Sequence, residues 1–287
     1  MFRQFVVCPL EAAIAYLLVA FFRVLPPDLA SAIGGKVCRA IGPLLSLSRR
    51  AHRNLQIAFP EMGEAERNTV LAGMWENLGR LTAELPHLRA LRDHGYIEVV
   101  GGDHLERSGR PLIVCTAHVG NWEIAPPATT LFGIQVDTVY RAPNNPLVDG
   151  LLRKLRRDGG GGNSIPKGGS GARAIVKALA KGGAILMVID QKMNDGIPVP
   201  FFGRDAMTAP ALASLALRYG CSVVPLQVER LAGTRFRVTV HPPMEIVSTG
   251  DRRADSLAVM TRVNALVEGW IRQRPEQWLW LHNRWPT

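Results

Sequence analysis

A histidine and a glutamate follow a short apolar run in this 287-residue chain. The run 112–116 predicts a buried strand, and the polar sequence after it contains His118 and Glu123. A carboxylate bonded to one imidazole nitrogen fixes the tautomer and leaves the other nitrogen to accept a proton from a hydroxyl. On a continuous helix the two side chains would lie about 140° apart, so they meet only if the chain turns at Gly120 and Asn121. We interpret the pair as a candidate general base and its orienting carboxylate. The spacing alone fits an unreactive strand-end histidine and a helix-start glutamate equally well.

Metal and cysteine chemistry are not indicated by the sequence. The motif H-E-x-x-H is absent, no second histidine lies near His118, and the four cysteines include no C-x-x-C pair. Cys115 and Cys221 lie in apolar runs, where a small buried side chain is the commoner role. We therefore expect no metal and no cofactor.

Apolar runs alternate with helical stretches from about residue 97 onward. Such alternation indicates an α/β domain with a mostly parallel central sheet flanked by helices, whose functional groups gather at the carboxyl ends of the strands. We expect one domain over residues 26–287, because no linker long enough to divide it is visible. The run 236–240 alternates apolar and polar residues and predicts a hairpin with the strand before it. The predicted strands are 112–116, 136–140, 184–189 and 222–228, and the predicted helices are 66–85, 145–157, 172–181, 209–219 and 254–273.

Residues 5–22 form an apolar stretch in which only Pro9 and Glu11 fall outside the apolar set. The stretch is at the short edge of the roughly 17–25 residues that a membrane-spanning helix needs. Glu11 is costly at mid-membrane and tolerable near an end, so spanning and lying flat are both open. A signal peptide cleaved after 30–32 and a buried core helix are the alternatives. We interpret residues 1–25 as an uncleaved N-terminal membrane anchor.

The composition is basic, with 34 Lys plus Arg against 24 Asp plus Glu and a formal charge of +10. Hydrophobic residues make up 47% of the chain and charged residues 20%, which excludes general disorder. The charge fits nucleic acid, an anionic membrane or an acidic substrate, and 153–157 is a basic run. Because no nucleic-acid-binding module is visible and aromatic residues are only 7%, we expect no nucleic acid partner. An anionic membrane explains a basic surface as well.

The segment from His118 to Glu123 resembles the H-x4-D/E motif of the lysophospholipid and glycerol-phosphate acyltransferase superfamily. The sequence around it resembles one branch, the lipid A biosynthesis late acyltransferase family of Gram-negative bacteria. The resemblance runs from about residue 10 to the end and implies a glycerol-phosphate acyltransferase-like α/β fold with an N-terminal hydrophobic helix. The passages that carry it, in the family's order, are 54–60, 74–79, 139–146, 190–192, 199–210 and 275–285.

The resemblance implies catalytic and binding roles for particular residues. His118 would deprotonate the acceptor hydroxyl, and Glu123 would orient it. Arg141 and Asp190 resemble the family's other site residues, and each follows a predicted strand. Arg141 would hold a phosphate or the oxyanion, with a surface salt bridge as the alternative role. For Asp190 the alternative is a helix or turn cap.

Three further residues are candidate substrate contacts. Asn144 is first a turn residue and second a contact, Gly120 would direct its N–H toward an oxyanion, and Lys167 follows a glycine-rich stretch. That stretch lacks the pattern G-x-x-x-x-G-K-[ST], and we expect residues 159–162 to form a mobile loop over the site. The segment 201–203 fits an acyl channel and core packing about equally.

What the resemblance implies is an O-acyltransferase that needs no cofactor. It would move an acyl chain, expected to be lauroyl with myristoyl next, from acyl carrier protein to a hydroxyl of a 3-hydroxyacyl chain on Kdo-lipid IVA. Its partners would be acyl carrier protein, a phosphorylated glycolipid acceptor and the anionic inner membrane at its cytoplasmic face, where we expect a monomer. The alternatives are another phospholipid or glycolipid acceptor, and a non-catalytic basic lipid-binding protein of the membrane surface. Chain length and the hydroxyl acylated depend on pocket depth, which the sequence does not place.

Overall fold

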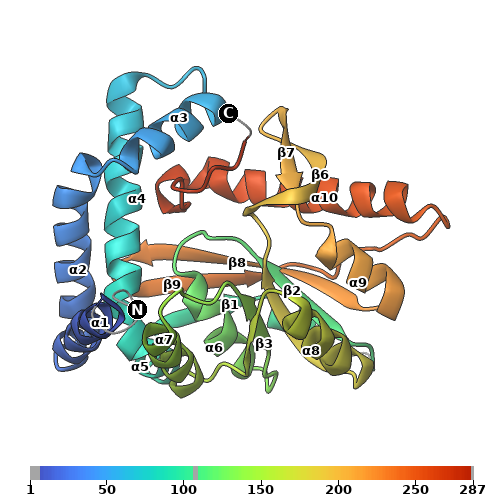
Figure 1. Cartoon of the computed structure of the whole chain (residues 1–287), viewed down its shortest axis with the longest axis horizontal. Helices are drawn as coiled ribbons and strands as arrows, with labels where there is room; N and C mark the ends of the chain where they lie inside the picture. The colour runs from blue at the N-terminus through green and yellow to red at the C-terminus, as the bar shows by residue number, and fades with distance from the viewer. Residues whose placement is uncertain (1–6, 106–108, 286–287) are drawn as a thin grey trace.

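The computed structural model describes residues 7–105 and 109–285. Its centre is a seven-stranded sheet (Figure 1). The strand order is β1 (Ile97–Val100), β9 (Arg235–Val240), β8 (Ser222–Ala232), β2 (Leu112–Thr116), β5 (Ala184–Val188), β3 (Asp137–Tyr140) and β4 (Ser164–Pro166). The run β8-β2-β5-β3-β4 is parallel, whereas β9 is antiparallel to β8 and parallel to β1. The predicted mostly parallel sheet and the predicted hairpin at its C-terminal strand are confirmed.

Alternate residues of the buried strands face two layers of helices. Ile113 and Ile185 belong to one core cluster, which also includes side chains of α8 (Gly169–Ala180), α9 (Ala211–Tyr219) and α10 (Arg252–Gln273). Val114 and Leu186 belong to the other, with side chains of α5 (Leu88–Asp93) and α6 (Ala125–Thr130). An additional helix, α7 (Pro146–Asp158), packs beside α5. The sheet is therefore covered on both faces, which explains why its strands are continuous apolar runs.

A second, two-stranded sheet stands over the first one, made by β6 (Lys192–Phe201) and β7 (Arg204–Thr208). This hairpin was not among the strands predicted from the sequence. Phe201 and Phe202 lie at its turn, 1% and 6% exposed, and their rings contact Trp285 at centroid distances of 5.7 and 6.1 Å. Of the two roles considered for segment 201–203, the structure shows core packing.

The chain before α5 and β1 is helical and contains α1 (Cys8–Arg23), α2 (Pro27–Ile41), α3 (Ser48–Ala58) and α4 (Glu64–Glu84). Figure 1 shows α2 and α4 side by side, and they touch at the backbone, because a Cβ on Gly34 would lie 2.5 Å from the carbonyl oxygen of Gly79. Apolar side chains of α1, among them Leu17 at 70%, are exposed. Over residues 7–105 and 109–285, no helix has the length and apolar character needed to cross a membrane. The anchor expected at residues 1–25 stays a prediction, and its first six residues lie outside the described part.

The four glycines 159–162 form a close-packed turn between α7 and β4. A Cβ on Gly159 would lie 2.7 Å from Leu88 Cβ, and one on Gly162 would lie 2.6 Å from the Val136 carbonyl oxygen. Gly160 has φ +104°, which favours glycine. The turn precedes β4, so it lies at the end of the sheet opposite to the carboxyl ends of the strands. The expectation of a mobile loop over the site is therefore wrong, because these glycines allow close approach.

Candidate active site

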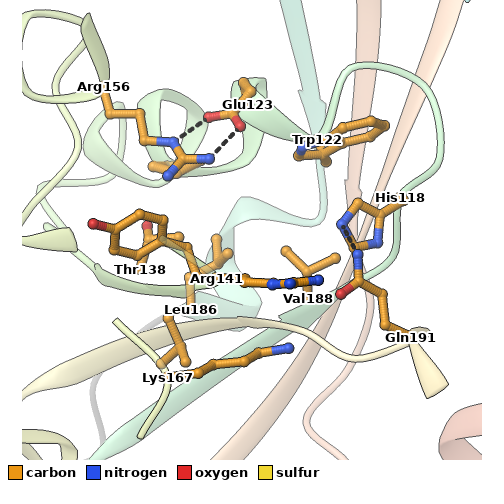
Figure 2. Close-up of a pocket in the computed structure, with 13 residues that line it drawn as sticks. His118, Trp122, Glu123, Thr138, Arg141, Arg156, Lys167, Leu186, Val188 and Gln191 are labelled. Atoms are coloured by element: carbon orange, nitrogen blue, oxygen red, sulfur yellow. Dashed lines mark hydrogen bonds and ion pairs between the residues drawn. The ribbon is translucent and has the colours of Figure 1, made fainter. Parts of the chain in front are cut away.

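Four predicted site residues follow four neighbouring parallel strands. His118 follows β2, Asp190 follows β5, Arg141 follows β3 and Lys167 follows β4. The strands are in register at these ends, where Thr116 pairs with Val188 and Tyr140 with Pro166. His118, Arg141 and Lys167 line one pocket of about 140 Å³ (Figure 2). The predicted convergence at the carboxyl ends of the strands is thus what the structure contains.

The imidazole of His118 is bonded to Asp190. His118 Nδ1 lies 2.6 Å from Asp190 Oδ1, and the backbone N–H of His118 donates to Oδ2 at 2.9 Å. The indole Nε1 of Trp278 also donates to Oδ2, at 2.6 Å. Burial alone would raise the pKa of Asp190, which is 2% exposed, but the His118 charge and these hydrogen bonds bring it well below its usual range. Because an ionised carboxylate only accepts, Nδ1 carries the proton and Nε2 keeps a free lone pair.

The free nitrogen of His118 faces the side-chain amide of Gln191. Gln191 Nε2 lies 3.2 Å from His118 Nε2 and 2.9 Å from His282 Nε2, so one amide group spans both rings. Burial, together with the nearby His118, lowers the pKa of His282 to about 4. His282 is therefore neutral near pH 7 and can accept the amide proton. Gln191 itself lines the pocket. A hydroxyl group bound there would take the place of the Gln191 amide beside Nε2 of His118.

Glu123 does not orient His118 in this structure, and the prediction that it does is corrected. Both oxygens of Glu123 accept from Arg156, at 2.7 Å from Nε and 2.6 Å from Nη2, in the bidentate pair drawn in Figure 2. Burial by itself raises the pKa of Glu123, but the charge and hydrogen bonds of Arg156 make the net pKa lower than usual. Glu123 still lines the pocket, where it and Arg156 form a charged wall opposite Lys167.

Arg141 and Lys167 are two further cations of this pocket, and Figure 2 shows both side chains extending toward Gln191 and His118. Within the described residues no carboxylate forms an ion pair with either side chain. Burial lowers the pKa of Lys167, and the neighbouring Arg141 charge lowers it further, while Asp190 opposes both. Two unpaired cations in one pocket favour an anionic group, such as a phosphate or an oxyanion.

Two of the predicted contacts are not in the pocket. The N–H of Gly120 donates to the carbonyl oxygen of Gln277 at 3.0 Å, so it is not free to bind an oxyanion. Asn144 is exposed, and neither pocket of the site includes it among its described lining residues. Its neighbour Asn145 caps α7, accepting from the N–H of Leu147 at 3.0 Å. Asn144 therefore lies in the bend before α7, in agreement with the turn role that was expected first.

A larger, mostly apolar pocket of about 510 Å³ adjoins the first one. The two share Arg141, Lys167 and Gln191. Apolar side chains of β5, α8, α9 and β6 line it, including Ile175, Met187, Ile189, Met193 and Leu212. The pocket that contains His118 and the apolar pocket thus meet at the three shared side chains.

Four residues of the site were missed from the sequence. Arg156 was one member of the basic run 153–157, and its spacing on α7 gave no sign that it alone turns inward. Gln191, Trp278 and His282 lie within passages that carry the family resemblance, but no spacing rule connects them to residue 118. Trp278 lies beside the His118–Asp190 pair because Val119 and Trp278 form an antiparallel bridge. The N–H of Leu279 also donates to the His118 carbonyl oxygen, at 3.0 Å.

Comparison with known proteins identifies the family of this chain. A lipid A biosynthesis lauroyltransferase of Escherichia coli K12 is 28% identical, with 84% of this chain and 80% of the relative covered. A myristoyltransferase of lipid A biosynthesis from the same organism is 27% identical over 89% and 80% of the two chains. A solved 1-acyl-sn-glycerophosphate acyltransferase of Thermotoga maritima has a TM-score of 0.36 and 16% identity, covering 87% of this chain and 100% of that one. The family described as bacterial lipid A biosynthesis acyltransferase matches residues 7–287. The chain therefore belongs to this family and is an O-acyltransferase of lipid A biosynthesis.

Proposed function

We propose that this enzyme transfers an acyl chain, lauroyl first among the candidates, from acyl carrier protein to a hydroxyl of a 3-hydroxyacyl chain on Kdo-lipid IVA. The observation that carries the proposal is the His118–Asp190 pair, whose free nitrogen opens on a cationic pocket beside an apolar one. The cationic pocket suits a phosphorylated acceptor, and the apolar pocket suits the acyl chain. The named activities of the relatives are consistent with such a transfer.

The proposed reaction needs one base and one set of donors. Nε2 of His118 removes the proton of the acceptor hydroxyl while its oxygen attacks the thioester carbonyl, forming a C–O bond. The tetrahedral oxyanion is stabilised by Arg141 and Lys167. The C–S bond then breaks, and the proton on His118 passes to the leaving thiolate, so the products are the ester and the free carrier thiol. Asp190 stabilises the imidazolium between these steps.

We also propose that the enzyme works as a monomer on the cytoplasmic face of the inner membrane, held through α1 and α2. Exposed apolar side chains gather on these helices and the chain just after them: Leu10, Ile14, Leu17, Phe21, Val37, Ile41, Leu44 and Leu45. Lys36 on α2 and Arg49 and Arg50 at the start of α3 would favour an anionic leaflet. Helices of this kind lie in the interface plane with their apolar side in the lipid.

The decisive experiment is an assay of purified protein with Kdo-lipid IVA and one acyl carrier thioester at a time. We expect the acceptor to gain one acyl chain, with lauroyl faster than myristoyl or palmitoleoyl, measured by mass spectrometry. Product with another phospholipid acceptor and none with Kdo-lipid IVA would contradict the proposed acceptor. Vesicle flotation tests the membrane surface: binding to anionic vesicles should decrease with salt and with Leu17→Glu, whereas Leu257→Glu, on the exposed side of α10, should have no effect.

A further inference from the structure

A buried polar cluster lies behind the loop that joins His118 to Glu123, outside both pockets. Its centre is Glu84, fully buried near the end of α4, whose two oxygens accept from Arg230 Nη1 at 2.5 Å and Nη2 at 2.9 Å. Asn121, also fully buried, donates from Nδ2 to Glu84 Oε2 at 2.7 Å. The cluster therefore includes a residue of the loop that lies between His118 and Glu123.

The cluster fixes the backbone on both sides of the turn. Asn121 Oδ1 accepts from the N–H of Glu123 at 3.1 Å, which starts the short helix that bears Glu123. Asn77 Nδ2 donates to the carbonyl oxygen of Gly120 at 2.8 Å, and its own Oδ1 accepts from Arg230 Nε at 3.0 Å. Gly120 has φ +59° and a Cβ there would lie 2.4 Å from the Val228 carbonyl oxygen, so the turn has little room to adjust.

The outer end of the cluster reaches the N-terminal helices. Ser31 Oγ on α2 donates to Glu84 Oε1 at 2.7 Å. So short a side chain can span the gap only because α2 and α4 touch at Gly34 and Gly79. The same carboxylate thus contacts α2, the end of β8 through Arg230, and the turn after β2.

Burying an ion pair costs desolvation that apolar side chains of similar volume would avoid. Among the described residues that line the two pockets of the site, neither Glu84 nor Asn121 occurs. We propose that Glu84 and Asn121 are positioning residues that hold the turn at residues 120–121, so that His118 and Glu123 face the same pocket. This inference rests on the proposed transfer reaction for its kinetic readout.

The test exchanges the amide and the carboxylate between the two positions. Asn121→Asp places two carboxylates at a contact that is now a 2.7 Å hydrogen bond, and Glu84→Gln leaves Arg230 without its charge partner. In the double variant, the new amide nitrogen at position 84 can donate to the new carboxylate at position 121, which can still accept from the N–H of Glu123. Arg230 Nη1 then keeps the amide oxygen as its acceptor, whereas Arg230 Nη2 loses its acceptor at position 84. A small misplacement of reacting groups can cost about 10²-fold. We expect each single variant to lose about that factor in kcat with the donor KM within about two-fold, and the double variant to recover at least half of the loss on a logarithmic scale.

The matched control is Asn264→Ala on α10. Asn264 is a buried amide, 2% exposed, that donates to the Pro200 carbonyl oxygen at 3.2 Å and to Thr208 Oγ1 at 3.3 Å. We expect Asn264→Ala and the two single variants all to lower the unfolding temperature. Only Asn264→Ala should leave kcat within about two-fold of the wild-type value. Single variants that are folded and keep full kcat, or a double variant without recovery, would overturn the proposal.

A readout independent of turnover separates this proposal from the proposed function. The imidazole ¹⁵N resonances of His118 should shift in Asn121→Asp, return in the double variant and stay unchanged in Asn264→Ala. If the wild-type enzyme transferred no acyl chain to any lipid acceptor, the proposed function would fail, and these resonances would decide the positioning role alone. Unchanged resonances in Asn121→Asp would then overturn it.

Discussion

The two buried carboxylates beside the pocket differ in the partner that each one holds. Asp190 bonds an imidazole at 2.6 Å, and Glu123 bonds a guanidinium through both of its oxygens. Both have a pKa below the usual range, so both are ionised near pH 7. Arginine keeps its proton at any working pH, whereas a neutral imidazole has a lone pair that can accept one. The His118–Asp190 pair can therefore transfer protons, and the Arg156–Glu123 pair can only contribute fixed charge and shape.

The largest effect should come from removing the base itself. His118→Ala should lower kcat by about 10³–10⁴-fold, because it removes the nitrogen that accepts the proton of the acceptor hydroxyl. Product formation by mass spectrometry measures the loss, and circular dichroism checks the fold. His241→Ala, which removes an imidazole far from the pocket, is the control and should keep its activity. A folded His118→Ala variant with near wild-type turnover would rule out the mechanism.

Amide substitution of the two carboxylates tests the comparison directly. Asp190→Asn should lower kcat by about 10²–10³-fold, because the neutral amide no longer stabilises the imidazolium or selects the Nδ1–H tautomer. Glu123→Gln should cost only about 10-fold, since an amide keeps one acceptor toward Arg156. Both are read from kcat at saturating donor and acceptor. If Glu123→Gln cost more than Asp190→Asn, the roles assigned to the two pairs would be reversed.

His282, beside the proton-transferring pair, should make stability depend on pH. Its pKa is about 4 in the folded protein and about 6.5 when unfolded, so the unfolded chain binds the proton more tightly. Stability should therefore fall as the pH decreases from about 6.5 to 4, by up to about 3 kcal/mol. Urea unfolding of wild type and His282→Gln at pH 7, 5.5 and 4 measures this difference. If the free energy of unfolding changed equally with pH in the two proteins over that interval, His282 would not titrate in this way.

A conservative change on the other side of the fixed-charge pair should have an effect as small as that of Glu123→Gln. Arg156→Lys keeps the charge but loses the bidentate geometry, so transfer should decrease by about 10-fold. A higher acceptor KM would show that the Arg156–Glu123 pair helps to bind the acceptor. A lower kcat would show that it acts in the transition state. Arg157→Lys, on the exposed side of the same helix, is the matched control. Equal behaviour of the two variants would mean that the Arg156–Glu123 pair has no part in the reaction.

Much of the fold followed from apolar patterning. The long buried runs of β2, β5 and β8 are unmistakable, because both faces of the sheet are covered. The β6–β7 hairpin was missed because Gly196, Pro198 and Pro200 interrupt it and are typical of turns rather than strands. Its residues pair across an isolated two-stranded sheet, where such side chains are tolerated.

The site was predicted in its position and mispredicted in its pairing. Strand-end placement indicated His118, and the family resemblance added Arg141 and Asp190, each of which follows a predicted strand. Lys167 was a candidate only because it follows the glycine-rich stretch, since the strand before it was not predicted. The spacing of Glu123 from His118 within one loop, however, does not state which carboxylate reaches the imidazole. That depends on β5 lying directly beside β2, a neighbour relation that only the folded sheet establishes.

The bridge between residues 119 and 278 has a consequence for the order of events during synthesis. Trp278, which holds Asp190, is 88 residues further along the chain than its partner. Chains are made at about 5–20 residues per second, so the histidine leaves the ribosome many seconds before the segment that completes its surroundings. A nascent chain that has folded its first strands therefore carries the base without its finished carboxylate partner, and catalytic competence arrives as one of the last steps of folding.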